Sequence, residues 1–265
     1  MGAQSALRRY SKTAVMAAAS YVGDSPLFLL DYLLRFLRVA ALLSLWRMVL
    51  AGKGEVSGMT LASTLTYTLI AEAFAEPLAG RTALEDALWD GSIANRLLRP
   101  VGTFRDLAGE ACGRWAFGLA VFSLPLLLVA PLLGVNPLPA GPEAAVLFVV
   151  SLALAVSVGL ALDCVFCTLM VAFGLDRWAL HQVRSAVTIL LTGALVPLAF
   201  MPWGIGEVFA WLPFAAMASA PLRIYTGTGP ALALLAMQAA WSLVLWPLAH
   251  RLWQANRERL VCYGG

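Results

Sequence analysis

Charged side chains are scarce in this sequence: 12% of the 265 residues are Asp, Glu, Lys or Arg, while 61% are hydrophobic and the mean hydropathy is +0.81. A soluble domain has about a quarter charged and about half apolar residues, so this chain is too apolar for one. Several apolar runs approach the roughly 20 residues that cross a bilayer as a helix, and none alternates like a barrel strand. The sequence predicts an all-α, polytopic helical membrane protein.

The chain also lacks the motifs of several enzyme classes. Its two histidines, His181 and His250, form no H-E-x-x-H zinc motif, and no G-x-S-x-G nucleophile turn is present. Without a G-x-x-x-x-G-K-[ST] loop, ATP could drive this protein only by binding to another chain. Cys164 and Cys167 lie in an apolar helical run with no second pair, which favours a core position over a metal or redox site. We expect no metal site, no catalytic residue and no cofactor in this chain.

Apolar segments of suitable length predict six transmembrane helices in a single domain, residues 1–265. They cover residues 26–50, 59–78, 107–133, 143–173, 185–201 and 230–248. Before them, residues 3–21 have the spacing of a short amphipathic helix that lies in the membrane interface. Between the last two, residues 202–229 are apolar but interrupted by Pro213 and Pro221, which predicts two short outer or re-entrant helices.

Basic residues are placed unevenly among the predicted loops. If both ends of the chain lie on the same side, the segments on that side hold most of the arginines, and the opposite side holds Lys53 and Arg223. Cytoplasmic loops of membrane proteins carry such an excess of basic residues. The distribution therefore predicts a multi-pass protein with both termini in the cytoplasm.

Charged residues also occur inside two predicted spans. Arg35 and Arg38 lie in the first span, and Glu72 lies at a similar depth in the second if the two helices are antiparallel and rise about 1.5 Å per residue. A charge in lipid is costly unless it is paired. We therefore expect an intramembrane ion pair between Arg35 or Arg38 and Glu72. Its role stays open between a structural link and a group that lines a transport path.

The most charged part of the chain is residues 81–105, RTALEDALWDGSIANRLLRPVGTFR, between two predicted spans. Thr82 and Glu85 have the spacing of a capping box, and Ser92 can cap a second short helix that Pro100 ends. The sequence predicts a rigid, kinked helical loop in the cytoplasm. Its mixture of apolar and charged residues favours a docking surface over a loop that is merely solvated.

A membrane enzyme is an alternative for the same segment. Asp86, Asp90 and Gly91 resemble the start of the D-x-x-D-G-x-x-A-R motif of the CDP-alcohol phosphotransferases, whose aspartates hold a divalent metal ion. The spacing departs by an extra residue between the aspartates and by Asn95 before Arg96. The family's later G-x-x-x-D-x-x-x-D is absent. A membrane scaffold subunit that transports nothing is a third alternative.

Residues 90–100, DGSIANRLLRP, are similar to the G-x-I-A-x-x-L-x-R-P segment of type-2 ABC exporter permeases. Shorter similarities follow the family's order, at residues 45–47 (LWR), 197–202 (PLAFMP), 212–214 (LPF) and 264–265 (GG). Taken together, the chain resembles the six-span transmembrane subunit of a type-2 ABC exporter that is encoded with a separate ATPase subunit. The tail departs at Cys262 and Tyr263, where a more polar pair is expected.

This resemblance implies a permease in the inner (plasma) membrane of a bacterium, with no enzyme activity and no nucleic-acid partner. An ABC ATPase subunit, expected in two copies, would bind ATP and Mg²⁺ and would contact this chain at the loop of residues 81–105. A second permease, identical or paralogous, would pair with this chain in the lipid bilayer. The implied ATPase-contact residues are Glu85, Asp86, Trp89, Arg96 and Arg99, with Asp176, Arg177 and Trp178 secondary. The few polar groups in the spans favour an apolar or amphiphilic cargo.

Overall fold

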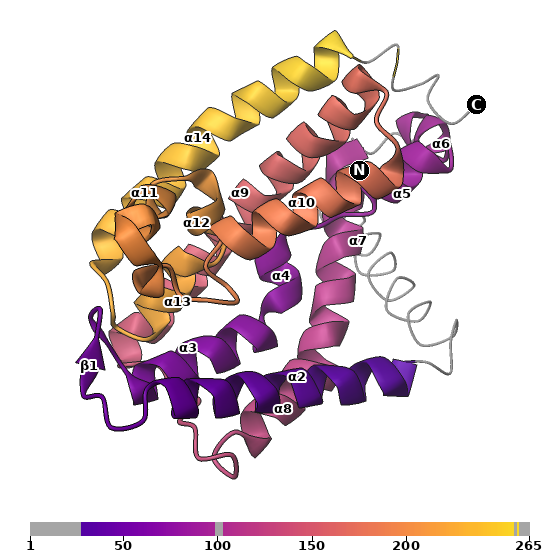
Figure 1. The fold of residues 1–265 in the computed structure, drawn as a ribbon. Helices are drawn as coiled ribbons and strands as arrows, with labels where there is room; N and C mark the ends of the chain where they lie inside the picture. The colour runs from indigo at the N-terminus through magenta and orange to yellow at the C-terminus, as the bar shows by residue number, and fades with distance from the viewer. Residues whose placement is uncertain (1–27, 99–102, 257–258, 260–265) are drawn as a thin grey trace.

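The computed structural model of the chain describes residues 28–98, 103–256 and 259. The predicted interfacial helix over residues 3–21 and the predicted contact residue Arg99 lie outside the described residues. The described part is mostly helical, as the sequence predicts. Its long helices connect through short helical pieces, and its strands form one small hairpin (Figure 1).

The longer helices are α2 (Phe28–Val49), α3 (Leu61–Ala73), α7 (Thr103–Gly118), α9 (Pro142–Phe173), α10 (Arg177–Leu191) and α14 (Ala231–Ala255). The shorter helices are α4 (Ala75–Ala79), α5 (Leu84–Trp89), α6 (Ile93–Leu97), α8 (Leu124–Val129), α11 (Ile205–Ala210), α12 (Pro213–Met217) and α13 (Ser219–Tyr225). A π-helical turn, η1 (Leu119–Ser123), joins α7 to α8, and the 3₁₀ turns η2 (Leu198–Phe200) and η3 (Pro202–Gly204) precede α11. Strands β1 (Glu55–Val56) and β2 (Met59–Thr60) form the antiparallel hairpin.

Three helical stretches of the described residues are long and apolar enough to cross a membrane: Thr103–Val129, Pro142–Phe173 and Ala231–Ala255. They correspond to the third, fourth and sixth predicted spans. α2 covers most of the first predicted span but carries several arginines along its length. The structure is thus that of a helical membrane protein, and the count of six spans stays a prediction.

The second predicted span, residues 59–78, is a broken helix. α3 ends at Ala73, and the chain resumes as α4 after Phe74. Pro77 causes the break, because it has no N–H to donate to the carbonyl group of Ala73 four residues earlier. The hydroxyl group of Ser123 donates to that carbonyl oxygen instead. The break therefore leaves no unsatisfied acceptor at Ala73.

The fifth predicted span, residues 185–201, differs most from the structure. α10 begins well before it, at Arg177, and ends within it at Leu191. The start is fixed by Asp176, whose carboxylate accepts from the N–H groups of Trp178 and Ala179 at 2.8 and 3.4 Å. After the helix the chain turns at Gly193, with a φ of 73°, and continues in short 3₁₀ turns. The predicted inner loop and part of the predicted span are therefore one helix.

The segment 202–229, predicted as two short outer helices, contains three: α11, α12 and α13. α12 and α13 are largely buried against α9 and α14. Gln238 of α14 holds them in place, since its amide donates to the carbonyl oxygen of Ala216 at 2.8 Å. Its carbonyl oxygen accepts from the hydroxyl group of Ser151 at 2.8 Å. Much of this segment therefore belongs to the core.

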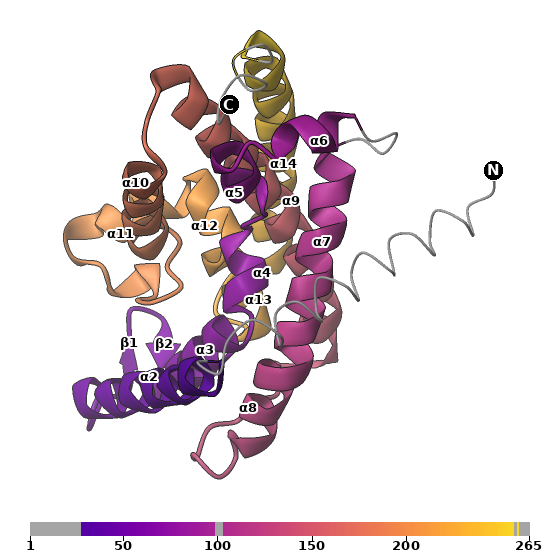
Figure 2. The same ribbon diagram turned by 90° about the vertical axis from the view of Figure 1, so that its right-hand side faces the viewer.

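α9 and α14 form the most extensive helix pair of the molecule and lie side by side (Figure 1). Polar contacts join them: the hydroxyl groups of Ser157 and Ser242 are 2.7 Å apart, and the indole N–H of Trp246 donates to Ser157 at 3.0 Å. Hydrogen bonds of this kind stabilise helix pairs in lipid. α7, η1 and α8 form a continuous helical column beside this pair (Figure 2).

Candidate functional site

The predicted docking loop folds as α5 and α6, at the end of the molecule where α9 ends and α10 begins (Figure 1). Leu84, Leu88 and Ile93 of this loop are fully buried. They belong to one apolar cluster with Met170 of α9 and Trp253 of α14. The loop is therefore packed as part of the helical body, because its apolar face is the one that the long helices cover.

The start of α5 is fixed by Asp163, a carboxylate of α9 that is 1% exposed. One of its oxygens accepts from the N–H group of Thr82 at 3.1 Å and from the Thr82 hydroxyl group. The other accepts from Arg184 of α10, which is 3% exposed. The predicted capping box of Thr82 and Glu85 is not formed, because the N-cap position of α5 is Ala83 and no side chain caps it. Asp163 joins α9, α10 and the docking loop in one buried charge network.

Two predicted contact residues, Glu85 and Asp86, turn toward α10. Arg177 forms an ion pair with Asp86 and lies 3.8 Å from the carboxylate of Glu85. The Nδ1 atom of His181 is also 3.8 Å from Glu85, which is 8% exposed. Glu85 is thus an internal link, while the side chains of Asp86 and Arg177 are about half exposed. These contacts bring both predicted contact segments together.

Trp89 and Trp178 are exposed beside this ion pair, by 50% and 69%. Trp89 follows Asp86 by three residues, so the two lie on one face of α5, and Trp178 is the residue after Arg177. Large exposed aromatic side chains next to a charged pair are typical of protein–protein contact sites. We call the set of Asp86, Trp89, Arg177 and Trp178 the junction surface.

Arg96 and Asp176, also predicted to contact an ATPase, have partners inside the chain. The guanidinium group of Arg96 is 2.8 Å from the carboxylate of Glu110 and 3.4 Å from that of Asp106, both on α7. Arg96 therefore links α6 to α7. Asp176 caps α10. Sequence patterns do not reveal the partners of Arg96, because only the packing of α6 against α7 brings them close, whereas the cap at Asp176 is a local signal.

Replacing Arg96 by Gln is expected to loosen α6 by about 1 kcal/mol, the usual scale of a partly exposed ion pair. Hydrogen exchange of the α6 amides in the purified protein should then be faster by roughly fivefold. The matched control is Arg105→Gln, which removes an exposed arginine of α7. Equal exchange in the two variants would show that the Arg96 ion pairs contribute nothing to the position of α6.

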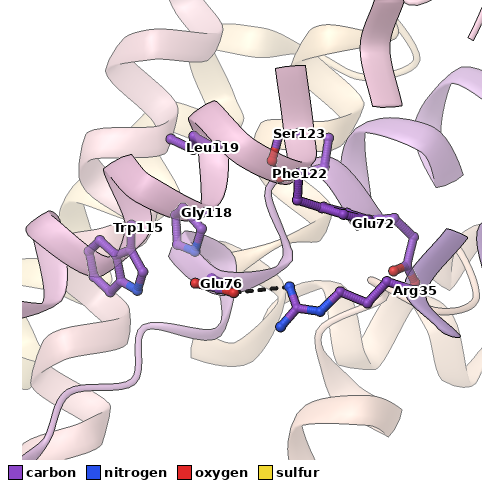
Figure 3. A pocket seen from close by; sticks show the side chains of 10 residues that line it. Arg35, Glu72, Glu76, Trp115, Gly118, Leu119, Phe122 and Ser123 are labelled. Atoms are coloured by element: carbon purple, nitrogen blue, oxygen red, sulfur yellow. Dashed lines mark hydrogen bonds and ion pairs between the residues drawn. The ribbon is translucent and has the colours of Figure 1, made fainter. Parts of the chain in front are cut away.

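The sequence predicts one ion pair between the first two spans, and the structure contains two. Arg38 pairs with Glu72. Arg35 pairs with Glu76 at 2.9 Å, as Figure 3 shows. The guanidinium carbon of Arg35 also lies 5.6 Å from the ring centre of Phe122, within cation–π range. The i, i+4 spacing of the two glutamates is the signal that could have identified the second pair. That these pairs lie inside the membrane stays a prediction.

The residues behind the alternative predictions have separate surroundings. Asp86 faces Arg177, whereas Asp90 accepts from the N–H group of Ser92 at 2.9 Å. Hydrogen bonds from Ser92 lower the pKa of Asp90. Cys164 and Cys167 are buried in the apolar cluster under the docking loop. Among the described residues, no group of three or more His, Cys, Asp or Glu side chains could hold a metal ion.

A comparison with protein families shows to which family of membrane proteins the chain belongs. The helices define a helical membrane protein, and residues 36–264 match the family model described as "ABC-2 family transporter protein". The match covers most of the chain, from within α2 to the last residues, so the chain belongs to this family of ABC transporter permeases. Members are the membrane components of transporters and are generally not catalytic, and an ABC ATPase is their general partner. Comparison with curated proteins finds no match.

Proposed function

We propose that this chain is the transmembrane subunit of an ATP-driven exporter and that a separate ATPase subunit binds it at the junction surface. Two ATPase subunits and a second permease, identical or paralogous, complete the transporter in the inner membrane of a bacterium, with both termini of this chain in the cytoplasm. The observation that carries the proposal is the exposed pair Trp89 and Trp178, which flanks the ion pair of Asp86 and Arg177.

The rigidity of this end of the molecule supports the proposal. A docking surface transmits a movement only if it is firmly attached to the helices that must move. The buried residues of α5 and the Asp163 network attach it to α9 and α10. α9 has 32 residues and is thus about 48 Å long, enough to carry a displacement across a bilayer.

The position of α10 supports a transport mechanism. Its first turn belongs to the junction surface, and its later turns line a cavity together with residues of α3 and α4. ATP binding and hydrolysis in the partner would favour different packings of α10 against these helices, because the ATPase makes different contacts in each state. Access to the cavity would change with the nucleotide state of the partner.

Replacing Trp89 and Trp178 together by Ala is expected to weaken the binding of the ATPase by roughly 30-fold or more, the usual effect of truncating a central Trp. The test uses the tagged full chain, co-expressed with the ATPase encoded beside it, and measures the ATPase recovered and its turnover. The matched control is Trp203→Ala, because Trp203 is 91% exposed but lies on η3.

Equal recovery of the ATPase with both variants would place the contact elsewhere on the chain. If the unaltered chain recovers no ATPase at all, or leaves its turnover unchanged, the proposed function is wrong.

A further inference from the structure

Two adjoining cavities lie between the first helices of the chain and α10. The larger, about 590 Å³, is lined mainly by charged residues, and we call it the polar cavity. The other, about 520 Å³, is lined mainly by apolar residues, and we call it the apolar cavity. They share the lining residues Arg38, Ala75, Ala79 and Arg81. Each has the size of a small-molecule site, and together they form an amphipathic groove.

Positive charge predominates in the polar cavity. Its lining includes the five arginines Arg35, Arg38, Arg81, Arg114 and Arg177 and three carboxylates, those of Glu76, Glu85 and Asp86. The carboxylates already pair with Arg35 and Arg177. Arg38 pairs with Glu72, which lines the apolar cavity, so the lining of the two cavities together carries five arginines and four carboxylates.

Arg81 occupies the boundary between the two cavities. Its guanidinium group is 3.3 Å from the hydroxyl group of Ser185 and 3.4 Å from Nδ1 of His181, both on α10. No carboxylate of the described residues lies within ion-pair distance of it. Burial, followed by the charge of Arg184, lowers the pKa of Arg81, and the more distant carboxylates of Glu85 and Asp163 offset this only in part.

The apolar cavity offers a surface for a hydrocarbon chain. Its walls include Leu78 of α4, Ile189 of α10 and Leu195, and the last two are exposed by 57% and 38%. The hydroxyl groups of Thr188 and Thr192 also line it, but each donates to a carbonyl oxygen one turn earlier. These hydroxyl groups therefore need no polar partner from a ligand.

We propose that the two cavities bind one anionic amphiphile from the bilayer, with its phosphate or carboxylate headgroup at Arg81 and its apolar chain between α3–α4 and α10. An arginine fork matches such a headgroup because it can donate two parallel hydrogen bonds. The groove thereby deepens the proposed function by naming the class of cargo. Binding itself requires no ATPase, so the two proposals can fail separately.

The test uses the purified full chain in nanodiscs of phosphatidylcholine and a dodecyl phosphate that carries a photoreactive diazirine in its chain. Labelling is expected on α3, α4 and α10. Unlabelled dodecyl phosphate should displace the probe at a concentration at least about tenfold lower than dodecyltrimethylammonium does, because only the phosphate complements Arg81. Equal displacement by the two amphiphiles would overturn the proposal.

Replacing Arg81 by Gln should weaken displacement by dodecyl phosphate about tenfold, while Arg81→Lys, which keeps the charge but not the fork, should retain only part of the headgroup preference. The control is Arg251→Gln, an exposed arginine of α14 outside both cavities. If dodecyl phosphate displaces the probe equally well from the Arg81→Gln variant, the proposed headgroup site is wrong. Absence of labelling, together with a disulfide between two copies of the Leu195→Cys variant, also contradicts this site, because a second copy would then fill the groove.

Labelling at the groove in a chain that recovers no ATPase would support the binding site and contradict only its role in export. Recovery of an active ATPase complex without labelling at the groove would support the proposed function and overturn this inference.

Discussion

Replacing Asp163 by Ala is expected to destabilise the protein by about 3–5 kcal/mol, the cost of breaking a buried ion pair from one side. The change leaves the guanidinium group of Arg184 buried without its carboxylate. It also removes the acceptor of both the N–H and the hydroxyl group of Thr82. The apparent Tm of the detergent-purified protein, followed by tryptophan fluorescence, should fall by roughly 10 °C.

Two further variants separate the loss of charge pairing from a general effect of substitution. Glu207→Ala removes an exposed carboxylate of α11 and should change stability by at most about 0.5 kcal/mol. The double variant Asp163→Leu with Arg184→Met removes both buried charges and should recover much of the lost stability. If the double variant is as unstable as Asp163→Ala, packing rather than charge explains the loss. If Asp163→Ala behaves like the Glu207 variant, the network does not stabilise this region.

Replacing Gly80 by Ala is expected to cost about 3 kcal/mol or more. A Cβ atom at this position would lie 2.5 Å from the Cα atom of Gly159 on α9, a contact that neither backbone can relieve by rotating a side chain. Gly80 also has a φ of 58°, a left-handed conformation that costs other residues about 1–2 kcal/mol. The yield of folded protein and its apparent Tm should both decrease, because α4 can no longer approach α9 closely.

Two other glycines separate the cost of the left-handed conformation at Gly80 from the cost of the steric clash with α9. Gly174 has a similar φ of 63° but open space around it, so Gly174→Ala should show the conformational cost alone, about 1 kcal/mol. Gly159 lies within a regular helix, and a Cβ atom there would lie 2.8 Å from the Cα atom of Gly80, so Gly159→Ala should show the steric clash alone. Similar stabilities for Gly80→Ala and Gly174→Ala would mean that the close approach is not required.

The parts of the fold that the sequence predicts are those with local signals. The run of apolar residues gives α9 almost to the residue, and the cluster of helix start signals gives the short helices of the docking loop. The sequence divides α10 between a loop and a span, because most of its charged and polar residues lie in its first half and an apolar run lies in its second, although Asp176 has the type and position of a cap. The apolar run over residues 59–78 likewise predicts one continuous helix, and the break between α3 and α4 depends on the single residue Pro77.

For single residues of the candidate site, the sequence likewise predicts only those contacts that have a local signal. The sequence identifies Arg38 and Glu72 because a charge inside an apolar span needs a partner. It does not show that Glu85 and Arg96 face inward, since their partners Arg177 and Glu110 lie on helices whose packing decides the contact. Residue type thus identifies a charged segment, whereas tertiary packing decides which of its side chains are available to another protein.

The interruption at Phe74 has a mechanical consequence. On one side of it α3 pairs with α2, and on the other α4 pairs with α9 through the contact of Gly80 and Gly159. The carbonyl oxygen of Ala73 accepts from Ser123 instead of from an N–H group of the next turn, so the series of helical hydrogen bonds is interrupted here. Bending at this interruption would rotate the α2–α3 pair relative to the α4–α9 pair. The width of the space beside α10 would then change at the expense of the contacts of α3 with α13 and α8.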